Sequence, residues 1–298
     1  MKNLIMFYYN FDEFDLLKKS NIYYFRYQND LYSFEIIENV EQLKNIIHII
    51  NLLALNRYFQ LIPNIYHQFF TEYQGQLYAL FLQNRLTCSV VNELLHLPLV
   101  PKDFLEQSHI EISVINWDVL WSKKVDYYEY QVQHISNIYP LVTESFNYFI
   151  GMTETAISYI RYNFSYKETN FYLCHKRLNV DDYFHPKNLV IDYYPRDVAE
   201  YFKYLFFSNN YHNFPFLTFL RQLHFSYDDF ILLFSRLIYP SYYFDCYDEI
   251  INSQAREEQL KSILLRTKEY IIFLANIYNI ICQITPIPSV WWIKKETL

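Results

Sequence analysis

Four residues between positions 175 and 192 are of types that could take part in phosphoryl transfer. His175, Asp182 and Asp192 could move a proton or hold a divalent metal ion, whereas Arg177 carries a permanent positive charge. Phosphoryl transfer needs a base that faces the attacking hydroxyl and a Mg²⁺ ion that bridges the phosphates. This segment is therefore the first candidate site of the chain.

The elements around this segment must position its side chains. Residues Phe171–Cys174 and Leu189–Ile191 are short apolar runs bounded by polar residues, which predicts two small strands. Asp197 is expected to cap a helix that continues to Phe207 and to brace the preceding loop, not to bind a ligand. The candidate residues thus lie around two small strands and before a helix.

The residues before position 86 predict strands and one long helix. The turn signal Gln28-Asn29-Asp30 lies between two aromatic-rich runs and predicts a hairpin, and a second hairpin is expected to turn at Tyr73-Gln74-Gly75-Gln76. Asn39, with Gln42 three residues later, predicts a capped helix start, and apolar residues at helical spacing continue to Arg57.

Helical patterns dominate from about residue 88 onward. Long helices are predicted over residues 117–138 and 143–162, and Gly151 inside the second would permit a close helix crossing. Further helices are expected at residues 215–223, 227–237 and 253–282. We therefore divide the chain into a small β-rich lobe with one long helix, residues 1–86, and a helical lobe, residues 87–298.

This order of elements resembles the two-lobed, α+β fold of protein kinases and aminoglycoside phosphotransferases. Those proteins have a small antiparallel-sheet lobe and a mostly helical large lobe. Their catalytic loop carries a His-x-Asp motif after a short strand, and a second Asp at the end of a later strand holds metal. Cys174-His175-Lys176-Arg177 resembles this loop, and Ile191-Asp192-Tyr193 resembles the metal-binding segment.

Five sequence blocks, in consistent order, carry a narrower resemblance. The blocks are Trp117–Asp126, Gly151–Tyr159, Cys174–Arg177, Arg196–Glu200 and Arg236–Phe244. They resemble the kinase-like spore-coat proteins of endospore-forming bacteria, the CotS/YutH type. The resemblance implies a structural or assembly component of the spore coat, made in the mother cell, with other spore-coat proteins as partners. Trp121 and Asp197 are expected to be structural residues.

The catalytic positions implied by this resemblance are altered. Arg177 stands where the catalytic Asp is expected, and a guanidinium cannot accept a proton from a hydroxyl. Glu35 stands at the likely position of the phosphate-binding Lys and would repel phosphates, and Asp182 replaces a metal-binding Asn. Asp192 is retained, as a metal or nucleotide ligand or as a turn residue. His175 is expected to brace the loop as a core residue.

These changes predict a pseudokinase that uses no cofactor and acts through protein–protein contacts. The alternative is an active ATP-dependent phosphotransferase of the aminoglycoside/choline kinase type with rearranged groups. In that alternative Asp181, Asp182 and Asp192 serve as metal ligands and base, and the cofactor is Mg-ATP.

A second register of the catalytic loop is also possible. His185-Pro186-Lys187-Asn188 resembles the His-Pro-x-Asn end of the loop in small-molecule phosphotransferases. Asn188 precedes Asp192 by four residues, which is too few for the hairpin that normally separates the two metal ligands. Tyr183 would then stand at the base position, so the base is lost in either register.

Composition excludes several other classes of protein. The 298 residues include only two glycines, so Gly-rich nucleotide-binding loops and the Gly-x-Ser-x-Gly nucleophile elbow are ruled out. A net charge of −7 argues against nucleic-acid binding. The 32 Tyr and 26 Phe residues are interpreted as core residues favoured by an A+T-rich genome.

The sequence also predicts a chain that stays inside the cell that makes it. Four widely spaced cysteines lack the spacing of a zinc site and are expected to be reduced. The apolar run Leu4–Tyr9 is followed by acidic residues, unlike a signal peptide. The apolar stretch Tyr270–Cys282 is too short to span a bilayer.

Overall fold

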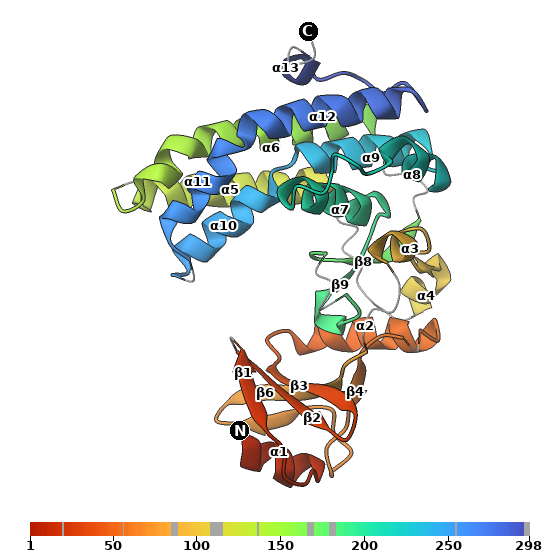
Figure 1. Cartoon of the computed structure of the whole chain (residues 1–298), viewed down its shortest axis with the longest axis vertical. Helices are drawn as coiled ribbons and strands as arrows, with labels where there is room; N and C mark the ends of the chain where they lie inside the picture. Colours follow the sequence, from red (N-terminus) through yellow and green to blue (C-terminus); the bar gives the residue numbers. More distant parts are fainter. Residues whose placement is uncertain are drawn as a thin grey trace. The chain divides into compact units, whose positions relative to one another are not determined.

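The described residues form two compact units. The computed structural model describes residues 1–19, 21–55, 57–84, 89–107, 116–135, 137–165, 170–178, 183–253 and 255–294. The first unit falls within Met1–Ile110 and Tyr172–Ile191, and the second within Glu111–Phe171 and Asp192–Leu298. A segment from the middle of the chain therefore packs with the N-terminal residues (Figure 1).

The first unit contains two sheets and several helices, and two strand ends, Phe171 of β8 and Asp192 of β9, are counted with the second unit. Its elements are α1 (Lys2–Tyr9), β1 (Leu16–Lys19), β2 (Ile22–Tyr27), β3 (Asp30–Ile36), α2 (Val40–Leu52), β4 (Gln60–Ile62), β5 (Thr71–Tyr73), β6 (Gln76–Leu82), α3 (Val90–Leu94), β7 (Leu99–Val100), α4 (Lys102–Gln107), β8 (Phe171–His175), the 3₁₀ helix η1 (Pro186–Asn188) and β9 (Leu189–Asp192). The larger sheet has the order β1-β2-β3-β6-β4, with β5 also paired to β6, and β7-β8-β9 form the smaller sheet.

Both predicted hairpins are confirmed. Tyr27 pairs with Asp30 across the β2–β3 turn, and Tyr73 pairs with Gln76 across the β5–β6 turn. Gln28 has a φ of 55° and Gly75 a φ of 73°, the left-handed conformation that tight hairpin turns require. The two small strands predicted around the candidate segment are also present, as β8 and β9.

The capped start of α2 is confirmed, whereas its predicted end is wrong. The Asn39 side chain accepts a hydrogen bond of 2.9 Å from the backbone N–H of Gln42. The helix ends at Leu52 instead of Arg57, and Ala54 has a φ of 51°. A left-handed residue cannot continue a right-handed helix, so the apolar spacing beyond Leu52 was misleading.

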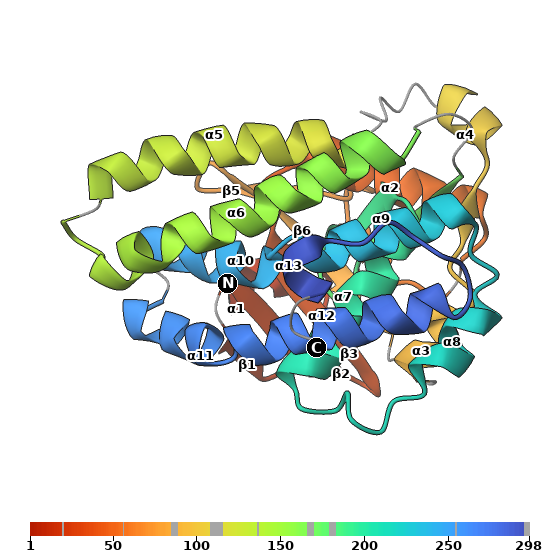
Figure 2. The same cartoon turned by 90° about the horizontal axis from the view of Figure 1, so that it is seen from above.

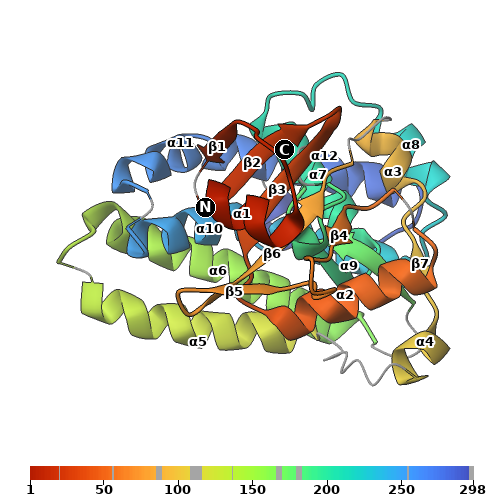
Figure 3. The same ribbon diagram turned by 90° about the horizontal axis from the view of Figure 1, so that it is seen from below.

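The sequence did not predict α1, since its residues Leu4–Tyr9 were interpreted only as an apolar run. Its Ile5 and Tyr9 are buried against the sheet residues Phe25, Phe34 and Leu80. Figure 3 shows α1 lying on the sheet. Two buried residues one helical turn apart are too weak a pattern to identify so short a helix.

The second unit is helical. Its elements are α5 (Trp117–Ile135), α6 (Pro140–Asn163), α7 (Pro195–Phe207), α8 (Phe216–Gln222), α9 (Tyr227–Ile238), α10 (Ser241–Ile251), the 3₁₀ helix η2 (Glu257–Gln259), α11 (Leu260–Leu265), α12 (Thr267–Cys282) and α13 (Trp291–Lys294). The long helices α5 and α6 lie side by side (Figure 2). None of the helices within the described ranges is both long and apolar enough to cross a membrane.

Three predictions for this unit are wrong. The helix expected over 253–282 is broken into η2, α11 and α12, and α10 was missed. A side chain added at Gly151 would meet no atom within 4 Å, so Gly151 does not permit a close crossing. Asp197 is not a helix cap, because α7 begins at Pro195 and Asp197 is its third residue, fully buried.

The chain makes most of its left-handed turns without glycine. The described non-glycine residues with positive φ are Asn10, Gln28, Ala54, His67, Gln74, Asn209, His224 and Ser253. Side chains in this conformation are disfavoured, since Cβ approaches the following carbonyl oxygen. Asn and His tolerate it best.

Candidate functional site

Asp192 lies at the end of β9 and is held by three donors of its own unit. Its Oδ1 accepts hydrogen bonds from the indole Nε1 of Trp117 at 2.9 Å and from the backbone N of Tyr193 at 2.8 Å. Its Oδ2 accepts a bond of 2.5 Å from Nη1 of Arg196. The Asp192 side chain is 1% exposed and that of Arg196 11%, so the ion pair is buried.

Trp117 connects this ion pair to a stack of aromatic and cationic side chains. Its ring stacks with that of Trp121 at a centroid distance of 5.5 Å, and Trp121 stacks on Tyr239 at 4.3 Å. The Arg236 guanidinium lies over both indoles, 5.5 Å from Trp117 and 5.9 Å from Trp121. Such cation–π contacts are strong where water is excluded.

The stack continues into a second buried ion-pair cluster. Glu200 on α7 accepts a bond of 2.9 Å from Nε of Arg236, and Lys203 lies 3.4 Å from the same oxygen. Lys203 also donates to the Tyr239 carbonyl at 3.0 Å and to the Ser241 hydroxyl at 2.9 Å. These five polar groups form hydrogen bonds with one another in a place where unpaired charges would be costly.

Three of the blocks that carry the sequence resemblance therefore meet in one cluster. Trp117–Asp126 provides the two indoles, Arg196–Glu200 provides Arg196 and Glu200, and Arg236–Phe244 provides Arg236 and Tyr239. Trp121, expected to be structural, lies inside this cluster and is 1% exposed. These blocks build a packed interior.

In the first unit, the side chain of Glu35 on β3 is also paired with cationic and imidazole groups. Its Oε1 accepts a hydrogen bond of 2.8 Å from Nε2 of His185, and its Oε2 accepts one of 2.9 Å from Nζ of Lys187. The backbone N of Lys187 donates to Nδ1 of His185 at 3.1 Å, so Nε2 is the ring nitrogen that donates to Glu35.

This pairing keeps Glu35 ionised in a buried place. Burial raises the pKa of the carboxyl, but the bond from His185 and the nearby Lys187 ammonium outweigh burial and lower the pKa to about 2. The His185 ring is packed between Phe59 and Phe81 at centroid distances of 5.0 and 4.6 Å. Glu35 thus ties β3 to the segment before β9.

The remaining residues of the candidate loop brace one another. His175 is fully buried, and its Nε2 lies 2.8 Å from the carbonyl oxygen of Tyr183, to which it donates. The Asn188 side chain accepts from the backbone N of Arg177 at 3.2 Å and donates to its carbonyl at 2.8 Å. Asn188, the metal ligand of the second register, thus holds the loop backbone. Asp181 and Asp182 lie outside the described residues.

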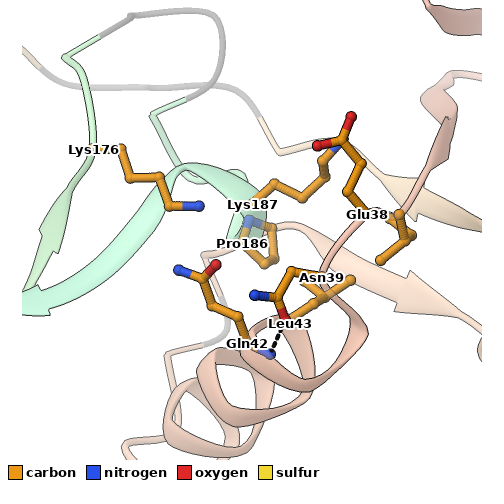
Figure 4. Close-up of a pocket in the computed structure, with 8 residues that line it drawn as sticks. Glu38, Asn39, Gln42, Leu43, Lys176, Pro186 and Lys187 are labelled. Carbon is orange, nitrogen blue, oxygen red and sulfur yellow. Dashed lines mark hydrogen bonds between the residues drawn. The ribbon is translucent and has the colours of Figure 1, made fainter. Parts of the chain in front are cut away.

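A pocket of about 230 Å³ opens beside this loop in the first unit. Asn39 and Gln42 at the start of α2 line it together with Lys176 and Lys187, and Figure 4 shows Lys176 and the Gln42 amide pointing toward the same space. Lys187 is paired with Glu35, and Glu38 is another lining residue. The opposite charges leave little net attraction for an anion.

The surroundings of Asp192 do not fit a Mg²⁺ ion, the metal that kinase-like folds use. Mg²⁺ needs carboxylate oxygens that face it in near-octahedral geometry, with no competing cation. Both Asp192 oxygens already accept hydrogen bonds, and the Arg196 guanidinium would repel a metal there. Within the described part of the chain, no three His, Cys, Asp or Glu side chains are grouped to share a metal ion.

Two residues that matter most were not singled out from the sequence. Arg196 neutralises Asp192, and Lys187 neutralises Glu35. Arg196 follows Asp192 by only four residues, but Asp192 ends β9 and α7 begins at Pro195, so the helical i, i+4 rule does not apply and could not have identified this pair. No sequence spacing links Glu35 with Lys187, which are 152 residues apart.

The fold is that of aminoglycoside phosphotransferases. A crystal structure of spectinomycin phosphotransferase with ADP and spectinomycin is similar, with a TM-score of 0.57 at 12% identity over 88% of this chain and 91% of that one. An aminoglycoside phosphotransferase from Alicyclobacillus acidocaldarius gives a TM-score of 0.58 at 9% identity over the same shares. At such low identity the likeness concerns the fold alone.

Sequence relatives identify the family. The endospore coat-associated protein YutH of Bacillus subtilis (strain 168) is 28% identical over 208 residues, 60% of this chain. The match spans 61% of that protein, less than two thirds of its length. The family described as "Spore coat putative kinase YutH" matches residues 2–277, nearly the whole chain. The resemblance found in the sequence is therefore confirmed, and the chain belongs to this spore-coat family of kinase-like proteins.

Proposed function

We propose that this protein has lost phosphoryl transfer and serves as a structural or assembly component of the spore coat. Its fold provides surfaces for protein–protein contacts with other spore-coat proteins. The name of the Bacillus subtilis relative, an endospore coat-associated protein, supports the location. The protein would be made in the mother cell and deposited on the forespore, and it would need no cofactor.

The buried ion pair of Asp192 and Arg196 is the observation that carries the proposal. In a kinase-like fold this Asp holds the metal that neutralises the phosphates. Here its carboxylate is 1% exposed and bonded to a guanidinium and an indole. A carboxylate that forms these buried bonds stabilises the fold and is not available to coordinate a metal ion.

Two further observations point in the same direction. Glu35 is ionised on β3, where the resemblance implies a phosphate-binding Lys. Arg177 occupies the position of the base, and its backbone is fixed by Asn188. A guanidinium at that position does not take a proton from an acceptor hydroxyl.

Calorimetric titration of the purified protein with ATP, with and without Mg²⁺, tests the loss of nucleotide chemistry. We expect no saturable heat at millimolar ATP and no release of ADP. Asp192→Asn is the test variant, and Asp126→Asn, an exposed Asp on α5, is the matched control. Metal-dependent binding that Asp192→Asn abolishes and Asp126→Asn preserves would overturn the proposal.

The same titration separates the alternatives. Binding accompanied by ADP release would support an active ATP-dependent phosphotransferase with Mg-ATP as cofactor. Binding without turnover would support a nucleotide sensor.

The assembly role needs a test in spores of the producing organism. A fluorescent fusion should form a shell around the forespore, and deletion of the gene should change the set of proteins extracted from the coat. A fusion that stays dispersed through the mother cell, with an unchanged coat extract, would contradict the assembly role.

A further inference from the structure

A groove of about 450 Å³ on the second unit lies between α6 and the segment that leads into α13. Tyr159 of α6 fixes its two sides, because the Tyr159 hydroxyl donates a bond of 2.8 Å to the Pro288 carbonyl. Trp291 and Trp292 line the side opposite α6. Figure 2 shows where α13 lies over this unit. The groove belongs to none of the sites described above.

The walls of this α6–α13 groove expose large aromatic surfaces. Tyr162 is 87% exposed and Trp291 is 72% exposed. Most of the aromatic residues of this unit are buried instead, including Tyr243, Tyr247 and Tyr270. Exposed Trp and Tyr side chains are the residue types that dominate binding energy at protein interfaces.

The charge and spacing of the groove indicate what it would bind. Glu154, Ser158 and Tyr162 follow one another at intervals of four residues, so they form one stripe along α6. Glu154 is the charged member among the described lining residues, and it lies about 12 Å from Tyr162 along the helix axis. Aromatic faces attract cations, and a carboxylate pairs with Arg or Lys.

We propose that the α6–α13 groove binds an extended, basic segment of a partner protein. One Arg or Lys side chain lies against the rings of Tyr162 and Trp291, and a second pairs with Glu154. The two cations are about four residues apart, because an extended chain advances about 3.3 Å per residue. The net charge of −7 favours the approach of such a segment. The cellular meaning of this binding rests on the proposed assembly role.

Calorimetry with synthetic peptides tests the groove on the full-length protein. The probe is a nine-residue Gly/Ser peptide that carries two arginines four residues apart, and the matched peptide has glutamines in their place. We expect saturable binding of the arginine peptide, weakened by added salt, and none of the glutamine peptide. Tyr162→Ser and Glu154→Gln should each weaken binding by about tenfold.

Substitutions on α5 provide the matched control. Tyr130→Ser and Glu129→Gln remove an exposed Tyr and an exposed Glu from another helix of the same unit, and binding should be unchanged. Equal loss in both sets, or no loss in either, would show general attraction to an acidic protein and overturn the proposal. Absence of binding by the wild-type protein would also overturn it.

Light scattering tests the other occupant, a second copy of the chain. A dimer that Tyr162→Ser dissociates would show that the groove is a self-association surface, which contradicts the proposal. ATP binding with release of ADP in the earlier experiment would refute the loss of phosphoryl transfer and leave the peptide result intact, so the two proposals fail separately.

Discussion

Glu35 in the first unit and Asp192 in the second are both buried carboxylates, yet they differ from the kinase-like pattern in different ways. At Glu35 the charge is opposite to that of the expected Lys, and Lys187 and His185 compensate for it. At Asp192 the expected charge is retained, but Arg196 and Trp117 bind the carboxylate. The proposed loss of phosphoryl transfer would therefore come from substitution at Glu35 and from occupation of the carboxylate at Asp192.

The difference shows that the identity of a motif residue does not establish its role. A search for motif residues would count Asp192 as a functional metal ligand and Glu35 as a defect. In the structure both carboxylates have the same role, because each pairs with a cation and connects two segments of its unit. The pairs differ in access to water, since the side chain of Lys187 is 38% exposed and that of Arg196 only 11%.

The largest effect is expected from Asp192→Ala. The substitution leaves the Arg196 charge buried without its carboxylate and the Trp117 N–H without its acceptor, so the free energy of unfolding should fall by about 3–5 kcal/mol. Urea unfolding followed by circular dichroism measures this loss. Asp126→Ala, at an exposed position, should change stability by less than about 0.5 kcal/mol. Equal values for the two variants would refute the structural role of Asp192.

Glu35→Gln should cost less, about 2–3 kcal/mol, because the Lys187 ammonium can turn toward water when its partner is lost. The same urea experiment measures it, with Glu38→Gln, an exposed neighbour, as the control. A cost larger than that of Asp192→Ala would reverse the comparison between the two carboxylates.

The pH dependence of stability should distinguish Glu35 from its Gln variant. The pKa of Glu35 is lowered from 4.5 to about 2 in the folded protein, so its stabilisation is complete above pH 4.5 and disappears as the pH falls toward 2. The difference in unfolding free energy between the wild-type protein and Glu35→Gln should therefore shrink by about 2 kcal/mol between pH 7 and pH 3. A constant difference would show that Glu35 has an ordinary pKa.

The smallest effect concerns the start of α2, beside the pocket that Lys176 and Lys187 line. Asn39→Ala removes the side-chain cap of this helix and should cost about 1 kcal/mol in thermal or urea unfolding. Gln42→Ala is the control, because the cap uses only the backbone N–H of Gln42. Loss of stability in both variants would indicate that side-chain contacts in the pocket, and not the helix cap, stabilise this end of the helix.

Local chemistry explains which parts of the fold the sequence could predict. The hairpins at Gln28 and Gly75 and the cap at Asn39 depend on neighbouring residues, so they are visible in the chain itself. The ends of α2 and α11 and the burial of Asp197 inside α7 depend on packing in the folded protein, so the sequence did not predict them.

The altered residues of the candidate site could be predicted from the sequence, but their partners could not. The substitutions Arg177 and Glu35 are plain in the sequence once the fold is guessed. The partners Lys187 of Glu35 and Trp117 of Asp192 come from segments 152 and 75 residues away, and no local pattern reveals them. Asp192 and Arg196 are close in sequence, but one ends a strand and the other lies in the following helix, so their pairing depends on how β9 leads into α7.

The left-handed turns made without glycine are consistent with the A+T-rich genome that we infer from the amino-acid composition. Glycine codons all begin with two G bases, so a strongly A+T-biased genome drives glycine out of a protein. Residues such as Ala54 and Ser253 then occupy a backbone conformation that glycine would adopt without steric cost. Each such turn should make the folded protein slightly less stable than it would be with glycine at the same position. A relative encoded by a G+C-rich genome would be expected to carry glycine at several of these eight positions.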